Sequence, residues 1–276
     1  MRGRGAYQLS RTDWNRNIRG EDLMTATQPR NVVLLDLDGT LTKSDPGIIA
    51  CVIRAFQELG RPVPDDAELH RFIGPAIIES MQRNHIPDDE LDRAVEIYRD
   101  YYTNKAVFDD PNQPGNKVPG RLYNTVYPGI PEQLRTLRNH GYVLVIATCK
   151  PEYQAKPICE HFGLDAMVDD IYGASKDNSR LDKDQVIRYG FEKMGFDETH
   201  GDRALMVGDR WTDVEGAKAC GLECLGCGWG YAEPGELADH GAYRIIDAVD
   251  QLYDAVHDFF NQRVDSLSKM LCSSGI

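Results

Sequence analysis

From Tyr127 onward, short apolar runs alternate with amphipathic helical patterns, and this alternation restricts the possible folds more than any other feature of the chain. Strands that alternate with helices in this way form parallel sheets, because each helix carries the chain back to the edge where the next parallel strand begins. A further apolar run over residues 32–35 precedes the alternation and predicts a short buried strand. The sequence therefore predicts an α/β protein with a parallel sheet wound by crossover helices.

The expected elements can be placed from the apolar periods and from the Gly and Pro residues between them. Strands are expected at residues 32–35, 142–147, around 171, 204–207, 222–225 and 243–246. Helices are expected at residues 130–139, 151–162, 183–194, 211–219, 234–239 and 248–263. Residues 47–118 carry helical patterns and no strand pattern, so we expect an all-helical insertion there.

These patterns divide the chain into a core and an insertion. Residues 31–46 and 119–265 are expected to form the α/β core, and residues 47–118 are expected to form a helical cap domain inserted into it. Residues 1–30 are polar and arginine-rich with little periodicity, and residues 266–276 follow the last helical pattern. We expect both ends to be disordered or loosely attached.

The charge balance argues against several classes of partner, and the cysteines indicate the redox compartment. The 276 residues include 31 basic and 44 acidic ones, and the formal net charge of −13 opposes non-specific binding to nucleic acid or anionic lipid. The apolar runs are far shorter than the roughly 20 residues that a membrane-spanning helix needs. The 7 cysteines are odd in number and scattered, which indicates reduced thiols. We therefore expect a cytoplasmic protein with neither a nucleic acid nor a membrane partner.

The first expected strand ends at two carboxylates. Asp36 and Asp38 lie two residues apart, so in an extended chain both side chains point to the same side. Gly39, which allows a sharp turn, and Thr40 follow. Ligands bind at the carboxyl edge of a parallel sheet, and two acids there suit a nucleophile and a proton shuttle. The alternative is an Asx turn that only caps the strand.

The sequence D-x-D-G-T after an apolar strand resembles the first motif of the haloacid dehalogenase-like superfamily. The second motif, a Thr or Ser after an apolar strand, resembles Thr148, which by itself could be only a helix cap. Lys150 and Pro151 complete a T-x-K-P run that is similar to the phosphoglycolate phosphatase-like branch. The resemblance implies a Rossmann-like, doubly wound core with the helical insertion as its cap.

Two further motifs follow in the family's order. The third is a lysine that opens a helix, and Lys183 fits this position best, with Lys176 as the alternative. The fourth resembles G-D-x-x-x-D, in which Asp209 ends an apolar strand and Asp213 follows one helical turn later. Four motifs in this order extend the resemblance over residues 31–250.

The resemblance also implies a Mg²⁺ site. Mg²⁺ prefers octahedral oxygen coordination and keeps several of its waters, so a few protein ligands and a substrate phosphate complete its shell. The expected protein ligands are Asp36, the backbone carbonyl of Asp38 and Asp209, and the resemblance implies that Asp213 either supports the waters of the metal or binds it directly.

The motifs together imply a Mg²⁺-dependent phosphatase that acts on a small phosphomonoester. Asp36 would attack phosphorus to give an aspartyl-phosphate, Asp38 would exchange protons with the leaving and entering oxygens, and Lys183 would offset negative charge. Thr148 would hold phosphate oxygens. A phosphosugar mutase keeps both acids and is the alternative, and a binding protein without catalysis is the third hypothesis.

Substrate choice is expected to lie with the cap. The run RFIGPAIIES resembles an F-I-G-P-P-L loop that members of this branch point into the site, although Ala76 replaces the second proline. The alternative is a Gly-Pro turn that only separates two helices. The candidate substrate contacts are Gly74, Pro75, Thr40 and Lys150. Phosphoglycolate, a nucleoside monophosphate and a small sugar phosphate all remain open, as does the oligomeric state.

A glycine-rich run at residues 226–231 mimics a dinucleotide-binding pattern. No periodic helix follows it directly, as that pattern requires. We therefore expect a loop beside the site.

Overall fold

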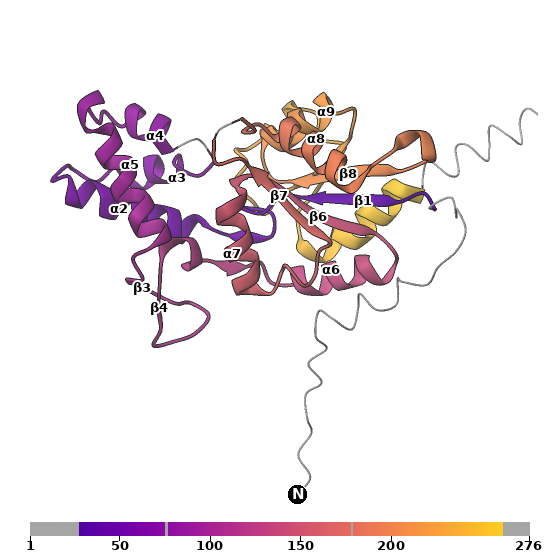
Figure 1. Ribbon diagram of the computed structural model, residues 1–276, viewed down its shortest axis with the longest axis horizontal. Helices are drawn as coiled ribbons and strands as arrows, with labels where there is room; N and C mark the ends of the chain where they lie inside the picture. Colours follow the sequence, from indigo (N-terminus) through magenta and orange to yellow (C-terminus); the bar gives the residue numbers. More distant parts are fainter. Residues whose placement is uncertain (1–27, 75–76, 178, 262–276) are drawn as a thin grey trace, which may run out of the picture.

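The computed structural model describes residues 28–74, 77–177 and 179–261 (Figure 1). The expectations for residues 1–27, for Pro75 and for the tail at 266–276 lie outside the described residues. Within the described ranges, no helix combines the length and the apolar character needed to cross a bilayer.

The main sheet has the strand order β10-β9-β8-β1-β6-β7, and all neighbouring strands run parallel. Its strands are β1 (Asn31–Leu35), β6 (Val143–Pro151), β7 (Asp170–Ala174), β8 (Arg203–Gly208), β9 (Cys224–Cys227) and β10 (Arg244–Ile246). The chain adds strands on one side of β1 and then on the other, so the sheet is doubly wound. This confirms the predicted α/β class.

Helices cover both faces of this sheet, with α8 and α9 on one face and α6 and α7 on the other (Figure 1). The helices of the core are α6 (Ile130–Asn139), α7 (Glu152–Phe162), α8 (Lys183–Met194), α9 (Trp211–Ala219), α10 (Glu236–Asp239) and residues 252–261, with short 3-10 turns at η1 (Gly120–Leu122), η2 (Glu198–His200) and η3 (Val249–Gln251).

The central strand β1 supplies side chains to both faces. Val33 and Leu35 pack with the residues of α6, α7 and the helix at 252–261, whereas Val32 and Leu34 pack with those of α8 and α9. All four side chains are fully buried, because successive residues of a strand point to opposite faces and both faces are covered. A strand that is buried on both faces requires apolar residues at successive positions, which explains the unbroken apolar run at residues 32–35.

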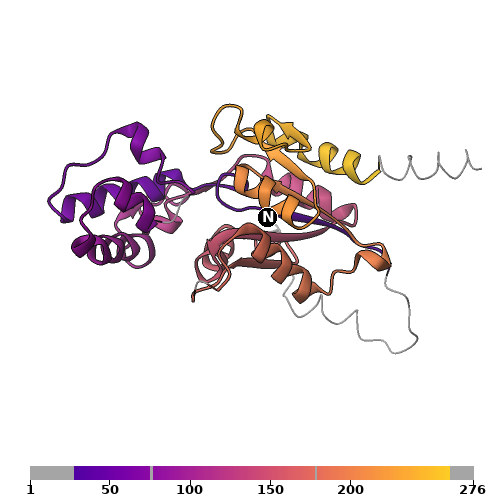
Figure 2. The same ribbon diagram turned by 90° about the horizontal axis from the view of Figure 1, so that it is seen from above.

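The cap lies to one side of the sheet and joins the core through a narrow connection (Figure 2). Its helices are α2 (Asp45–Glu58), α3 (Asp66–His70), α4 (Ile77–Arg83) and α5 (Asp88–Thr103). They enclose a second hydrophobic cluster, separate from those of the sheet, in which α2 packs on α5. The chain leaves the core near β2 (Thr42–Lys43) and returns near β5 (Thr125–Val126), and these two strands form an antiparallel pair.

The structure differs from the expected elements at several places, and the short strands β2 and β5 are among the elements that were not expected. The insertion contains a short antiparallel pair, β3 (Phe108–Asp109) with β4 (Lys117–Val118), where no strand was expected. Two-residue strands are too short to show alternation in the sequence. Strand β6 continues to Pro151 because β7 keeps pairing with it after a register shift. Strand β9 begins at Cys224, two residues later than expected, because a turn at Gly221 precedes it.

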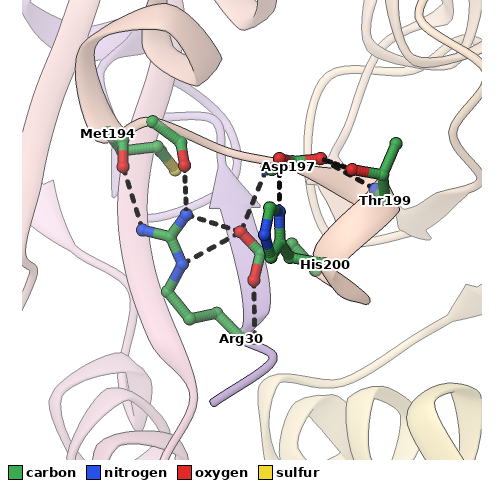
Figure 3. Close-up of polar contacts among 7 residues, drawn as sticks. Arg30, Met194, Asp197, Thr199 and His200 are labelled. Carbon is green, nitrogen blue, oxygen red and sulfur yellow. Dashed lines mark hydrogen bonds and ion pairs between the residues drawn. The ribbon is translucent and has the colours of Figure 1, made fainter. Parts of the chain in front are cut away.

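The amino end of β1 is fixed by Arg30 (Figure 3). Its backbone N and its Nε donate to the two carboxylate oxygens of Asp202, at 2.8 and 3.0 Å. The Nη1 and Nη2 atoms donate to the carbonyls of Met194 and Gly195 at 2.9 and 2.7 Å, where α8 ends and positive charge is favourable. The buried Asp202 directly precedes β8. The network therefore joins β1, β8 and α8 at the amino edge of the sheet, opposite to the carboxyl edge at which ligands are expected to bind.

Replacing Asp202 with Asn is expected to lower the free energy of unfolding by about 1–3 kcal/mol at neutral pH, because charged hydrogen bonds to Arg30 are lost. Those bonds hold the pKa of Asp202 below its usual value of 3.8. The stabilisation is therefore present above pH 3.8 and is lost as the pH falls through the lower folded-state pKa. Urea unfolding across this range should show the two proteins converging at low pH. A difference independent of pH would contradict this account.

Candidate active site

The expected site residues meet at the carboxyl edge of three adjacent strands. Asp36 follows β1, Asp209 follows β8, and Thr148 lies near the end of β6. The backbone N of Asp36 donates to the carbonyl of Val207 at 2.9 Å, which extends the pairing of β1 with β8 to the carboxylate itself. In doubly wound sheets the crevice beyond these strand ends binds ligands.

Lys183 lies buried between two carboxylates. It is the first residue of α8, and its Nζ lies 2.7 Å from Asp36 Oδ1 and 2.7 Å from Asp213 Oδ1. The same Nζ donates to the carbonyl of Ala147 at 2.9 Å. Burial alone would lower the pKa of Lys183, but the carboxylates of Asp213 and Asp36 raise it well above its usual value. Lys183 is therefore charged and offsets part of the negative charge around Asp36.

Asp209 is fully buried and is held by two donors. Thr40 Oγ1 donates to Asp209 Oδ1 at 2.9 Å, and the backbone N of Tyr231 donates to Asp209 Oδ2 at 2.8 Å. Burial and the carboxylates of Asp213 and Asp36 nevertheless raise the pKa of Asp209 well above its usual value. The hydroxyl of Thr40, a candidate substrate contact, thus donates its hydrogen bond to this carboxylate.

Asp36, Asp209 and Asp213 form a carboxylate cluster. One ligand oxygen from each lies within 4.8 Å of the other two. Lys183 contacts only two of the three, and burial raises the pKa of Asp213 to about 6 even beside that lysine. A hard divalent cation with oxygen ligands fits this donor set, because it would relieve the repulsion that remains. The expected fourth contribution, from Asp38, is its backbone carbonyl.

The side chain of Asp38 turns to a different partner. Its Oδ2 lies 2.8 Å from Lys150 Nζ, and this ammonium also donates to the Tyr102 hydroxyl of α5 at 2.6 Å. The second oxygen, Asp38 Oδ1, is buried without a hydrogen-bond partner among the described residues. The two acids of the D-x-D pair thus contact different lysines: Asp36 contacts Lys183, and Asp38 contacts Lys150.

Thr148 and Lys176 lie differently from Lys183. Thr148 is buried within β6, not after its end, and its Oγ1 accepts a hydrogen bond from the backbone N of Lys150 at 3.2 Å. Lys176 is exposed in the loop between β7 and α8. The buried position beside Asp36 belongs to Lys183, so the structure distinguishes between the two candidate lysines.

The loop between α3 and α4 reaches the core next to Asp209. Arg210 Nη1 donates to the carbonyl of Ile73 at 3.2 Å, while Arg210 Nε donates to Glu236 Oε1 at 2.8 Å. Gly74 has a φ of +105°, and a Cβ added there would lie 2.8 Å from Arg210 Nη1. The described part of the candidate substrate loop, up to Gly74, therefore contacts a core arginine, and a side chain at position 74 would have to displace that guanidinium and adopt an unfavourable positive φ.

Sequence patterns did not indicate three of these contributors. Arg210 directly follows Asp209, but nothing in its own sequence position predicts a contact with the cap. Tyr102 belongs to an apolar stripe of α5, where an aromatic residue normally indicates core packing. Tyr231 had a usable signal, because it ends the run at 226–231 that was expected beside the site.

Comparison with known proteins shows which family has sequences like this one. The family model described as haloacid dehalogenase-like hydrolase matches residues 33–227. A 5'-nucleotidase from Pseudomonas aeruginosa is 36% identical over 209 residues, which cover 75% of this chain and 87% of the relative. A phosphoglycolate phosphatase from Pseudomonas savastanoi pv. phaseolicola is 28% identical over 240 residues, which cover 84% of this chain and 81% of that protein.

Solved structures give the same likeness. The crystal structure of a predicted phosphatase from Clostridium acetobutylicum has a TM-score of 0.70 and 34% sequence identity to this chain. The match covers 84% of this chain and 100% of that structure. The similarity thus extends over both the sheet and the cap.

Gly39 separates the D-x-D pair from the rest of the loop, with a φ of +85°, and a Cβ there would lie 2.1 Å from Asp209 Oδ2. Replacing Gly39 with Ala is expected to displace Asp209 and lower the free energy of unfolding by more than about 2 kcal/mol. Gly60, with a φ of +67° and open space around it, is the matched control, and its replacement with Ala should cost only roughly 1 kcal/mol.

Urea unfolding gives both free energies, and calorimetric titration with Mg²⁺ should show binding to the Gly60 variant but not to the Gly39 variant. Equal losses of stability in the two variants would mean that the approach of Gly39 to Asp209 is unimportant.

Proposed function

We propose that this chain, a phosphatase that belongs to the haloacid dehalogenase-like hydrolase family, hydrolyses small phosphomonoesters with Mg²⁺ through an aspartyl-phosphate on Asp36. The observation that carries the proposal is the pair of lysine-bound acids beside the carboxylate cluster. Asp36 lies against Lys183, and Asp38 lies against Lys150 with its other oxygen unpaired among the described parts of the chain. A nucleophile and a proton shuttle thus stand next to a cation site.

The reaction proceeds in two steps at these acids. Lys183 holds Asp36 Oδ1, which leaves Oδ2 to attack phosphorus while the bond from phosphorus to the leaving oxygen breaks. Asp38 gives a proton to that oxygen, and the alcohol leaves. In the second step Asp38 takes a proton from water as the water oxygen attacks phosphorus. The bond from phosphorus to Asp36 then breaks, and inorganic phosphate is released.

The remaining residues hold charge and position. Lys183 is charged and buried, so it offsets the negative charge that gathers on the phosphoryl oxygens. Mg²⁺ held by Asp36, Asp209, Asp213 and the Asp38 carbonyl would add positive charge at the same place. Thr148 contributes its hydroxyl near the strand end, and the backbone at Gly74 reaches toward the substrate from the cap.

We infer that the substrate is a small phosphorylated metabolite. The similarity to a 5'-nucleotidase makes nucleoside monophosphates the first candidates, and the similarity to a phosphoglycolate phosphatase makes phosphoglycolate the second. A phosphate-release screen over such a panel, including sugar phosphates, would identify it. We also infer a cytoplasmic location, supported by 6 described cysteines that are free thiols, as expected in a reducing compartment.

Replacing Asp36 with Asn is expected to reduce phosphate release by at least about 1,000-fold, because an amide cannot attack phosphorus as a carboxylate does. Acid-quenched wild-type protein should carry one phosphoryl group on the peptide that contains Asp36, measured by mass spectrometry, and the variant should not. Asp66, whose side chain is 91% exposed on the cap, is the matched control, and its Asn variant should keep full activity. A phosphorylated peptide elsewhere in the chain would exclude this mechanism.

Removing divalent cations with EDTA is expected to abolish activity, and added Mg²⁺ should restore it. Mg²⁺ at about 100 times its dissociation constant should also raise the free energy of unfolding by about 2.7 kcal/mol, because only the folded chain assembles the three carboxylates. Replacing Asp209 with Asn should remove both effects, since it deletes one ligand charge. Activity that survives EDTA, or an Asp209 variant that is still stabilised by Mg²⁺, would disprove the cation site.

A further inference from the structure

A hydrogen bond between the cap and the core ends on Lys150, the lysine that is paired with the proposed proton shuttle Asp38. Lys150 Nζ, from the end of β6, lies 2.8 Å from Asp38 Oδ2 and donates to the Tyr102 hydroxyl at 2.6 Å. The Lys150 side chain is only 9% exposed, so few other partners can reach its ammonium. Tyr102 belongs to α5, so only one residue, Lys150, separates a cap side chain from the Asp38 carboxylate.

Tyr102 is held firmly in place. Its ring stacks on that of Tyr98 with a centroid distance of 5.5 Å and an interplanar angle of 12°. The backbone of Tyr102 lies at the junction with the core, because a Cβ added to Gly120 would lie 3.3 Å from its Cα. Tyr102 is therefore a fixed point near the connection between the cap and the core.

Lys150 needs such a fixed point. A lysine ammonium is a compact charge on a flexible four-carbon stem, so its place is set by the acceptors around it. Here the acceptors are Asp38 Oδ2 and the Tyr102 hydroxyl. With Oδ2 held in this way, the other oxygen of Asp38 is Oδ1, which is buried and has no hydrogen-bond partner within residues 28–74, 77–177 and 179–261, so we assign the proton transfer to it.

We propose that Tyr102 is a positioning residue that, through Lys150, orients Asp38 for proton transfer to the leaving oxygen. The proposal rests on the function proposed above and extends the reacting assembly from the core into the cap. It gives α5 a role in the chemical step in addition to covering the site. A carboxylate that is misplaced by a fraction of an ångström loses efficiency as a general acid, because proton transfer requires hydrogen-bond reach.

Replacing Tyr102 with Phe tests this proposal, since it removes only the hydroxyl and keeps the stacked ring. We expect kcat/KM to fall roughly 10- to 100-fold for an alkyl phosphate, whose leaving oxygen needs a proton. For 4-nitrophenyl phosphate, whose leaving group departs without one, the fall should be less than about 3-fold. A merely structural role would lower both values alike.

Thr103 supplies the matched control. Gln154 Nε2 of α7 donates to Thr103 Oγ1 at 2.9 Å, a second bond between cap and core that does not involve Lys150. The Val variant of Thr103 should retain kcat/KM within about 2-fold on both substrates, because Asp38 keeps its partners. If this variant reproduces the pattern of the Tyr102 variant, cap attachment is the cause and the proposal fails.

A second comparison uses Lys150 itself. Once Lys150 is replaced with Met, removing the Tyr102 hydroxyl should change kcat/KM by less than about 2-fold, because the residue it acts through is gone. Independent, multiplicative losses would overturn the proposal, as would equal losses on alkyl and aryl phosphates. Failure of the proposed function is seen separately, as unimpaired turnover by the Asn variant of Asp36.

Discussion

The ion pairs of Lys183 are the interaction on which the site depends. Three aspartates from the ends of β1 and β8 and from the start of α9 converge in a buried space, where unpaired carboxylates repel strongly. One ammonium bridges two of them and is anchored on the backbone of β6. This partial neutralisation lets the sheet keep its charged residues inside, yet it leaves a net negative charge that suits a divalent cation.

The cap is attached to the core at points that surround this charge. On one side, Tyr102 contacts Lys150, and Gln154 contacts Thr103. On the other side, Arg210 donates to the carbonyl of Ile73 in the loop between α3 and α4. Lys150 lies near the end of β6, Gln154 lies in the helix that follows it, and Arg210 lies just after β8. The position of the cap and the arrangement of the acids are therefore linked by short contacts.

The two acids have different surroundings, in keeping with the different roles proposed for them. Asp36 shares its lysine with Asp213 and belongs to the carboxylate cluster. Asp38 lies outside that cluster, and its second oxygen has no hydrogen-bond partner in the part of the chain that the structure describes. Two residues that are chemically identical and almost adjacent in the chain thus differ in their contacts, because Asp36 pairs with the lysine that opens α8 and Asp38 pairs with the lysine that is bonded to the cap.

The sequence by itself determined the sheet, the order of its helices and strands, and the placing of Asp36 and Asp209 after strands and of Lys183 at the start of a helix, whereas Thr148 lies within β6 and not after its end. These are local matters: apolar period, breakers and motif spacing are visible within a few residues of chain. Only the tertiary structure decided three other contacts. These are the ion pair of Lys150 with Asp38, the hydrogen bond of Lys150 to Tyr102 of α5, and the hydrogen bond of Arg210 to the carbonyl of Ile73. Each joins residues from different segments whose side chains look like ordinary packing or surface positions, and their partners are fixed only once the cap is placed against the sheet.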